Sequence, residues 1–248
     1  MPDFNLEKYI IDKNKNIIET EFVKRLEYWK LSKEEFINFW LQRYLIPKKF
    51  EELLYVWIEK AKNELKDTEL ESNLYMNYLD ENWLDINWNK LKIGSHKEWR
   101  NDFNNALFIK YSKIDLENIK ICDWTQSFID SYDNLISKWD WLMIIWALLF
   151  LEYNIPEEYK RVKISRDILF KNEFVINNND TIENITKKRI WCMYIDNHII
   201  HDSKIHYPTL KEKLIKYLNN EKNIDLIKKW IDIISEWKLK FYEWFDNL

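Results

Sequence analysis

Apolar residues recur every three or four positions along most of the chain, a spacing that predicts α-helices. The clearest case follows Ser32, which can cap a helix and form a capping box with Glu35 three residues later. Phe36, Phe39 and Trp40 then recur at helical spacing. The pattern therefore predicts a helix that begins directly after Ser32.

Proline and polar stretches divide the rest of the chain into further helical segments. We expect Pro47 to begin a new segment and Pro156 to lie in the first turn of another, because proline suits helix starts and disrupts helix interiors. Residues 83–94 show no helical period, and Ser95 can cap the helix that follows them. The expected helices are 33–45, 48–65, 68–83, 96–109, 123–154, 157–169, 188–206 and two amphipathic C-terminal helices.

The composition favours an all-α fold. One glycine and four prolines among 248 residues leave few of the residues on which hairpin turns and β-bulges depend. Fourteen tryptophans predict a large aromatic core. No internal repeat or long linker interrupts the helical pattern, so we predict a single all-α domain over residues 1–248.

Charge and hydropathy exclude several classes of partner. A net charge of −4 argues against nucleic-acid binding, which usually needs a basic surface. The longest apolar run spans residues 141–151, whereas a membrane span needs about 20 residues. The N-terminus lacks the pattern of a secretory signal. The two cysteines, Cys122 and Cys192, are too few for a disulfide framework, so we expect a cytoplasmic protein.

Three of the four histidines lie close together, in the stretch "NHIIHDSKIHYP". On one helix, His198, Asp202 and His206 would share an arc of about 80°, and imidazole with carboxylate is a usual ligand set for iron, manganese or zinc. The rise from His198 to His206 is about 12 Å, too long for one ion. Two ions, or a local π-bulge, would ease the reach. His201 lies about 60° off this face, and its role stays open.

Other candidate ligands lie far away in the sequence. His96 is the fourth histidine, Glu81 precedes it by 15 positions, and Glu152 follows an almost unbroken apolar run. A buried carboxylate normally needs a cation or metal partner, although Glu152 beside Tyr153 and Asn154 would also suit an exposed helix end. No Glu-x-x-His pair occurs, which excludes the ferritin-like di-iron bundle.

Four motifs together resemble the haem-oxygenase-like di-iron oxidases and oxygenases, the family of the chlamydial protein associating with death domains. The resemblance covers roughly residues 20–220, and the same fold occurs in pyrroloquinoline-quinone synthase and thiaminase II. The motifs are Asn77 with Asp80 and Glu81, then His96, then Glu152 before Ile155 and Pro156, and finally His198, Asp202 and His206.

The resemblance implies a haem-oxygenase-like helical bundle and a non-haem di-iron enzyme. Its two irons would cycle between Fe(II) and Fe(III) with O₂ as co-substrate, and manganese at one position stays open. The implied reactions are N-oxygenation, desaturation or oxidative C–C cleavage of a small amino-acid-like or fatty-acid-like substrate. The sequence leaves open an external electron donor and a homodimer. The implied metal ligands are Glu81, His96, Glu152, His198, Asp202 and His206.

The sequence departs from the family pattern in three places. The spacer between Glu81 and His96 is longer than usual, and Asp80 or Asp85 could replace Glu81 as the ligand. Asp202 and His206 are separated by three residues where two are commoner. Some members carry a further ligating glutamate near the position of Lys48, where this chain has none.

Two other functions remain alternatives. A thiaminase-II-like hydrolase would use Cys192 as its nucleophile, and it would not require all three clustered histidines. A non-catalytic interaction protein on the same fold would keep the site only as a vestige. A haem oxygenase is disfavoured, because its proximal histidine should lie in the first helix and none precedes His96.

Overall fold

The computed structural model describes residues 4–28, 30–82, 96–111, 121–138 and 141–247. Within these ranges the chain is helical and contains no strand, so the predicted all-α class is confirmed. The helices are α1 (Leu6–Ile18), α2 (Glu21–Glu27), α3 (Lys33–Lys60), α4 (Thr68–Asn82), α5 (His96–Tyr111), α6 (Asp123–Lys138), α7 (Trp141–Leu169), α8 (Lys171–Phe174), α9 (Ile182–His201), α10 (Tyr207–Leu214) and α11 (Glu221–Asp246), with π-helical turns η1 (Ala61–Leu65) and η2 (Asp202–His206) and a 3₁₀ turn η3 (Ile215–Tyr217).

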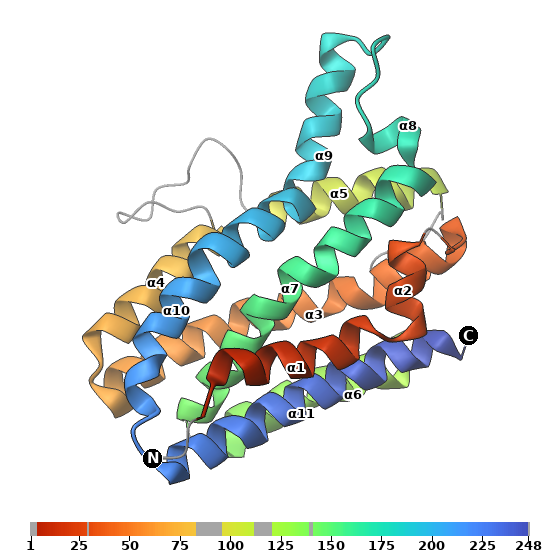
Figure 1. The fold of residues 1–248 in the computed structure, drawn as a ribbon. Coiled ribbons are helices and arrows are strands. Elements are labelled where there is room, and N and C mark those ends of the chain that lie inside the picture. Colours follow the sequence, from red (N-terminus) through yellow and green to blue (C-terminus); the bar gives the residue numbers. More distant parts are fainter. Residues whose placement is uncertain (1–3, 29, 83–95, 112–120, 139–140, 248) are drawn as a thin grey trace.

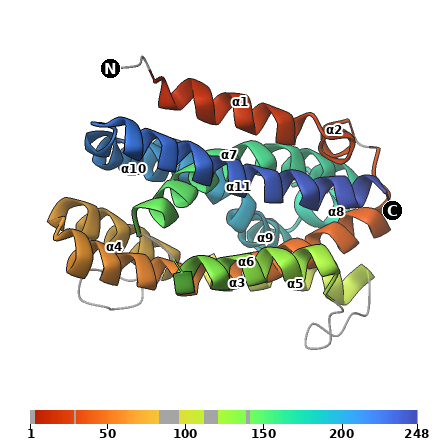
Figure 2. The same ribbon diagram turned by 90° about the horizontal axis from the view of Figure 1, so that it is seen from below.

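Helix α7 is the central element of the bundle (Figure 1). It packs against α1, α2, α3, α9, α10, α11 and η2. Seen from below, α3, α4, α5 and α6 lie on one side of the molecule, and α1 and α11 lie on the other (Figure 2). Because α7 contacts helices of both sides, its inward side chains reach the middle of the fold.

Two predicted helix starts at prolines are wrong. Helix α3 runs without interruption from Lys33 to Lys60, past Pro47, and α7 includes Pro156 in its interior. A proline in a helix interior costs about 3 kcal/mol. The buried apolar side chains on either side of each proline outweigh that cost, with Trp40 and Trp57 flanking the first and Leu151 and Tyr159 the second. The predicted helix 123–154 forms α6 and part of α7, and residues 139–140 between them lie outside the described residues.

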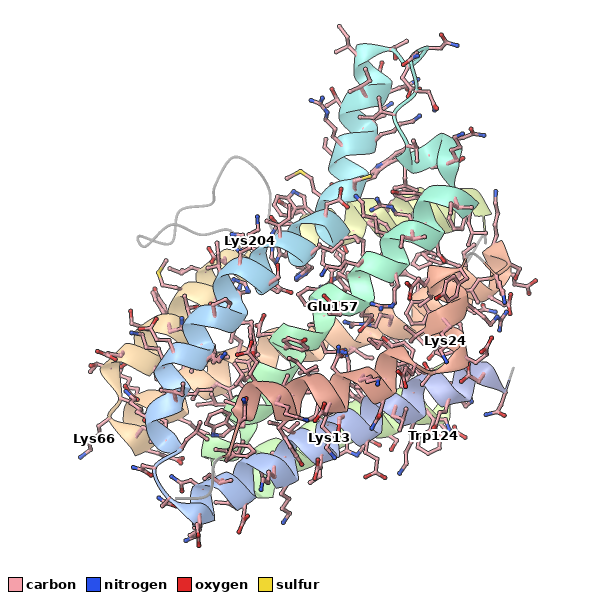
Figure 3. All side chains as sticks on the ribbon, in the orientation of Figure 1. Lys13, Lys24, Lys66, Trp124, Glu157 and Lys204 are labelled. Atoms are coloured by element: carbon pink, nitrogen blue, oxygen red, sulfur yellow. The ribbon has the colours of Figure 1, made fainter. Side chains whose placement is uncertain are left out.

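The interior is strongly aromatic, as the tryptophan content predicts. Trp40, Trp57, Trp146 and Trp230 are almost completely buried. The indole Nε1 of Trp40 donates a hydrogen bond to Asn104 Oδ1 at 2.7 Å, which satisfies its polar atom inside the core. Charged side chains such as Lys66 and Lys204 lie on the outside (Figure 3). Among the helices in the described ranges, none is long and apolar enough to cross a membrane.

The capping box predicted at the start of α3 is present. The Ser32 hydroxyl accepts from the Glu35 backbone N–H at 3.1 Å, and the Glu35 carboxylate accepts from the Ser32 backbone N–H at 2.7 Å. We expect Ser32→Ala to lower the free energy of unfolding by about 1 kcal/mol, because one backbone donor loses its partner. Urea unfolding measures the change. Ser203→Ala, which removes an exposed hydroxyl that caps no helix start, should cost much less, and equal losses would contradict the prediction.

Candidate metal centre

The histidine stretch forms the end of α9, the π-helical turn η2 and the start of α10. In η2 the backbone N–H of Tyr207 bonds to the carbonyl of Asp202, five residues earlier, as a π-helix requires. A π-turn accommodates one more residue than an α-turn. The extra residue between Asp202 and His206 is therefore absorbed locally, and both side chains remain buried on the inner side. Of the two arrangements predicted to ease the reach, the π-bulge is present.

This turn suggests a deletion experiment. Lys204 is an exposed residue of η2, and its deletion should convert the π-turn to an α-turn while His206 still faces inward. We expect the shortened chain to fold and to bind as much iron as the full chain. Deletion of Lys160, an exposed residue in the middle of α7, should unfold the chain, because no π-turn there absorbs the rotation of about 100°. Thermal melts and metal analysis measure both outcomes, and equal damage from the two deletions would contradict this view of η2.

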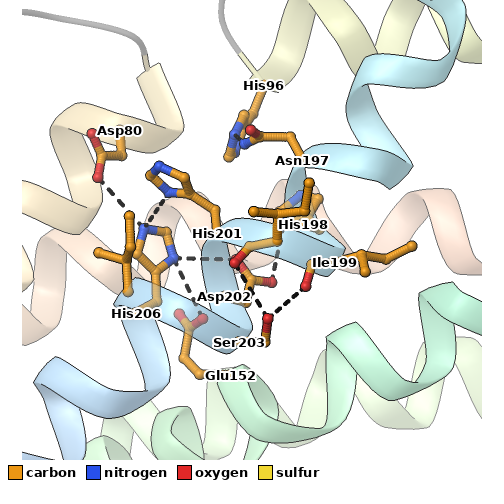
Figure 4. Close-up of polar contacts among 12 residues, drawn as sticks. Asp80, His96, Glu152, Asn197, His198, Ile199, His201, Asp202, Ser203 and His206 are labelled. Carbon is orange, nitrogen blue, oxygen red and sulfur yellow. Dashed lines mark hydrogen bonds and ion pairs between the residues drawn. The ribbon is translucent and has the colours of Figure 1, made fainter.

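The ring of His206 lies between two groups of possible ligands (Figure 4). Its Nδ1 lies 3.2 Å from Asp202 Oδ1 and 3.5 Å from Glu152 Oε2. Its Nε2 lies 3.5 Å from Asp80 Oδ2 and 3.4 Å from His201 Nδ1. Helices α4, α7 and α9 and the turn η2 supply these side chains, so the packing of the bundle assembles the cluster.

The surroundings of His206 and His201 shift the pKa values of these two histidines in opposite directions. Burial disfavours the imidazolium of His206, but Glu152, Asp202 and Asp80 outweigh that effect and hold its pKa well above the ordinary value. Burial and the nearby His206 lower the pKa of His201. In the metal-free chain the proton on His206 thus balances part of the negative charge, and a bound cation would replace that proton.

His198 and His96 extend the cluster from the other side of Asp202. His198 Nδ1 lies 3.1 Å from Asp202 Oδ2, and the rings of His198 and His96 are 4.7 Å apart. The side-chain amide of Asn197 holds the His96 ring through an Nδ2···Nε2 contact of 2.8 Å. His198 also packs edge-on against Tyr194, with ring centroids 4.8 Å apart. Asn197 and Tyr194 were not expected from the sequence, although they lie one residue and one turn before His198.

The structure thus brings five of the six expected ligands into one connected cluster: His96, Glu152, His198, Asp202 and His206. The side chain of Glu81 lies outside the described residues, as do Asp85 and the side chain of Lys48. Asp80, which the sequence offered as an alternative to Glu81, lies beside His206. His201, whose role was open, lies there too.

The donor groups fit a metal ion in kind and in position. Glu152, Asp202 and His206 are all buried, and their ligand atoms lie within 4.8 Å of one another, as do those of Asp80, His201 and His206. Ligands bound to one ion at about 2.1 Å lie at most about 4.2 Å apart, so small side-chain rotations would close either group around an ion. Carboxylate oxygen and imidazole nitrogen suit iron or manganese.

A narrow, partly enclosed cavity adjoins this cluster. Its lining includes Glu152, His198 and Asp202 from this cluster, together with the cationic side chains of Arg43 and Lys238. The centre of a water molecule has about 50 Å³ in which to move there, which is room for roughly four waters. Any metal held by Glu152 and Asp202 would therefore adjoin this space.

Cys192, the nucleophile of the alternative hydrolase, lies elsewhere. Burial raises the pKa of its thiol, which disfavours the reactive thiolate. Its Sγ donates to the backbone carbonyl of Phe174 at 3.4 Å, and Cys192 is absent from the described lining of the cavity. The geometry of the described residues therefore does not favour a thiol-based reaction in this cavity.

Comparison with known proteins supports the fold. No protein-family model matches the sequence, and no curated protein sequence matches it. Among solved structures, a CADD-like protein of unknown function from Nostoc punctiforme aligns over 96% of this chain and 96% of its own, with a TM-score of 0.58 and 13% identity. Likeness at this identity shows a shared fold. The chain therefore has the helical fold of a CADD-like protein, in agreement with the resemblance of its motifs.

Proposed function

We propose that the protein is a non-haem di-iron oxidoreductase that uses O₂ to oxidise a small amino-acid-like or fatty-acid-like molecule. The observation that carries the proposal is the convergence of Glu152, Asp202 and His206, all buried, with a second group of ligands on the far side of His206. The shared fold with a CADD-like protein is compatible with this function.

The candidate ligands would be divided between two iron ions. A neutral imidazole has one lone pair, so His206 would bind one ion, and His198 and His96 would serve with Asp202 near the other. Asp80 and His201, or Glu81 as the family resemblance implies, would complete the set. If bound, two Fe(II) ions would supply two electrons for the reduction of O₂, and the oxidised substrate or an external donor would supply the rest. Tyr159 and Tyr194 pack against His198 and would keep its ring aimed at the cavity.

Oxygen consumption tests the proposal. The metal-free chain is loaded anaerobically with Fe(II), mixed with O₂, and assayed against a panel of amino acids and fatty acids. We expect at least one class of substrate to accelerate oxygen uptake, and we expect Cys192→Ser to leave the rate unchanged. A reaction that needs Cys192 and proceeds without iron would contradict the proposal and favour the hydrolase.

A further inference from the structure

A second buried charge cluster lines the same cavity, away from the metal centre. Arg43 Nε donates to Glu158 Oε1 at 2.8 Å, and Lys238 Nζ donates to Glu158 Oε2 at 2.8 Å. The three residues come from α3, α7 and α11, and all are buried. Two cations thus share one carboxylate inside the protein.

The positive charge of this cluster is not balanced within the described residues. Among the described residues, Lys238 has one further hydrogen-bond partner, the neutral side-chain carbonyl of Asn154. Burial lowers the pKa of Lys238 to about 8, and Arg43 adds to this effect while Glu158 only partly offsets it. By contrast, Arg43 and Lys238 overcome the burial of Glu158 and lower its pKa to about 2. The carboxylate is therefore well compensated, and the surplus charge rests on the two cations.

The cavity beside these cations has a mixed lining that suits an amphipathic ligand. The apolar part of the lining comes from Phe128, Leu151, Ile155 and Phe241.

The Arg43 guanidinium carbon lies 5.5 Å from the centre of the Tyr159 ring, and the His198 ring lies 5.4 Å from the same ring. Arg43 and His198 therefore pack against the same aromatic ring in the cavity lining. Glu152 and Glu158 are six residues apart on α7, a rise of about 9 Å.

We propose that the cavity binds a small, slender monocarboxylate with its carboxylate against Arg43 and Lys238 and its apolar end toward Glu152 and Asp202. The carboxylate of the ligand would balance the surplus positive charge of the cluster. Charge-assisted hydrogen bonds from Arg43 and Lys238 would fix the orientation of the ligand. The orientation toward the metal rests on the proposed di-iron function, whereas binding of the anion does not. In this arrangement the carboxylate does not bind the metal, and a carbon several bonds away is presented for reaction.

Calorimetric titration with hexanoate and with 1-hexanol, on the metal-free full-length chain, tests the proposal. We expect hexanoate to bind at least about tenfold more tightly than the alcohol, as for a charge-assisted hydrogen bond. Lys238→Met should weaken the binding of hexanoate about tenfold and leave the affinity for 1-hexanol unchanged. Its melting temperature should stay within about 3 °C of that of the unmodified chain, because Glu158 keeps Arg43 as its partner. Lys188→Met is the matched control: Lys188 is also buried, pairs with Asp180 and does not line the cavity.

Equal affinity for hexanoate and 1-hexanol would overturn the proposal. So would a Lys238→Met chain that binds hexanoate normally or loses much of its stability, since the cluster would then be structural only. A second variant, Arg43→Lys, keeps the charge but not the planar guanidinium, and should weaken hexanoate several-fold. Iron uptake is measured separately, so failure of anion binding and failure of the di-iron site give different results.

Discussion

A chain carrying His206→Ala is expected to bind at most about one iron under anaerobic conditions, whereas the unmodified chain binds about two ions, as a dinuclear centre requires. His206 belongs to both ligand groups, on opposite sides of its ring. Its loss leaves Glu152 and Asp202 without a nitrogen ligand from η2 and leaves Asp80 and His201 without their shared neighbour. Metal analysis after anaerobic reconstitution and gel filtration measures the iron content, and circular dichroism first verifies that the variant is folded.

The same measurement tests the other candidate ligands. The family resemblance makes Glu81 the ligand, so it implies that Glu81→Ala loses one iron and that Asp80→Ala loses little. The position of Asp80 beside His206 changes the second expectation, and Asp80→Asn should now lose one ion. Glu157→Gln is the control, because Glu157 lies on α7 near the ligand Glu152 but pairs with Lys160 near the surface, and this variant should keep both ions (Figure 3). Full iron content in His206→Ala would contradict the assignment of the centre.

Glu158→Gln is expected to lower the free energy of unfolding by about 3–5 kcal/mol, because it leaves two buried cations without their carboxylate. The effect should depend on pH. The pKa of Glu158 is lowered to about 2 in the folded chain, against an ordinary value of about 4.3. A lowered carboxyl pKa stabilises the fold above the unfolded value, and this contribution is lost as the pH falls toward 2.

Urea unfolding at neutral pH and at acidic pH measures this effect. The difference between the unmodified chain and Glu158→Gln should be large at neutral pH and should shrink as the pH falls below about 4. Glu157→Gln serves again as the control and should change the free energy of unfolding by less than about 1 kcal/mol, as for a surface ion pair. A constant difference at all pH values would mean that the charge of Glu158 is not what stabilises the cluster.

Helical periodicity predicted most of the fold, because it reflects which face of each segment is buried. The capping box at Ser32 and the order of the helices could be read from local patterns. The breaks at Pro47 and Pro156 could not, since whether a helix continues through a proline depends on the packing of its flanks. That packing is a property of the whole bundle and not of the local sequence.

The candidate site was predictable to a similar degree. The spacing of His198, Asp202 and His206 on one helix indicated a shared face, and the structure groups them with Glu152 and His96. The approach of Asp80 and His201 depends on how η2 rotates against α4, which the spacing alone does not determine. In the second cluster, Arg43 and Lys238 are 115 and 80 residues away from Glu158 in the sequence, so no local sequence pattern predicts their contact.

The central claim is that this helical bundle holds a dinuclear iron centre, and an anaerobic Fe(II) titration of the unmodified, metal-free chain tests it most directly. Free Fe(II) is followed with a chelator that binds more weakly than the site. The account predicts a break at about two Fe(II) per chain, and no tight uptake by a His198→Ala/His206→Ala chain. Uptake that is absent, or that is the same in both chains, would contradict it.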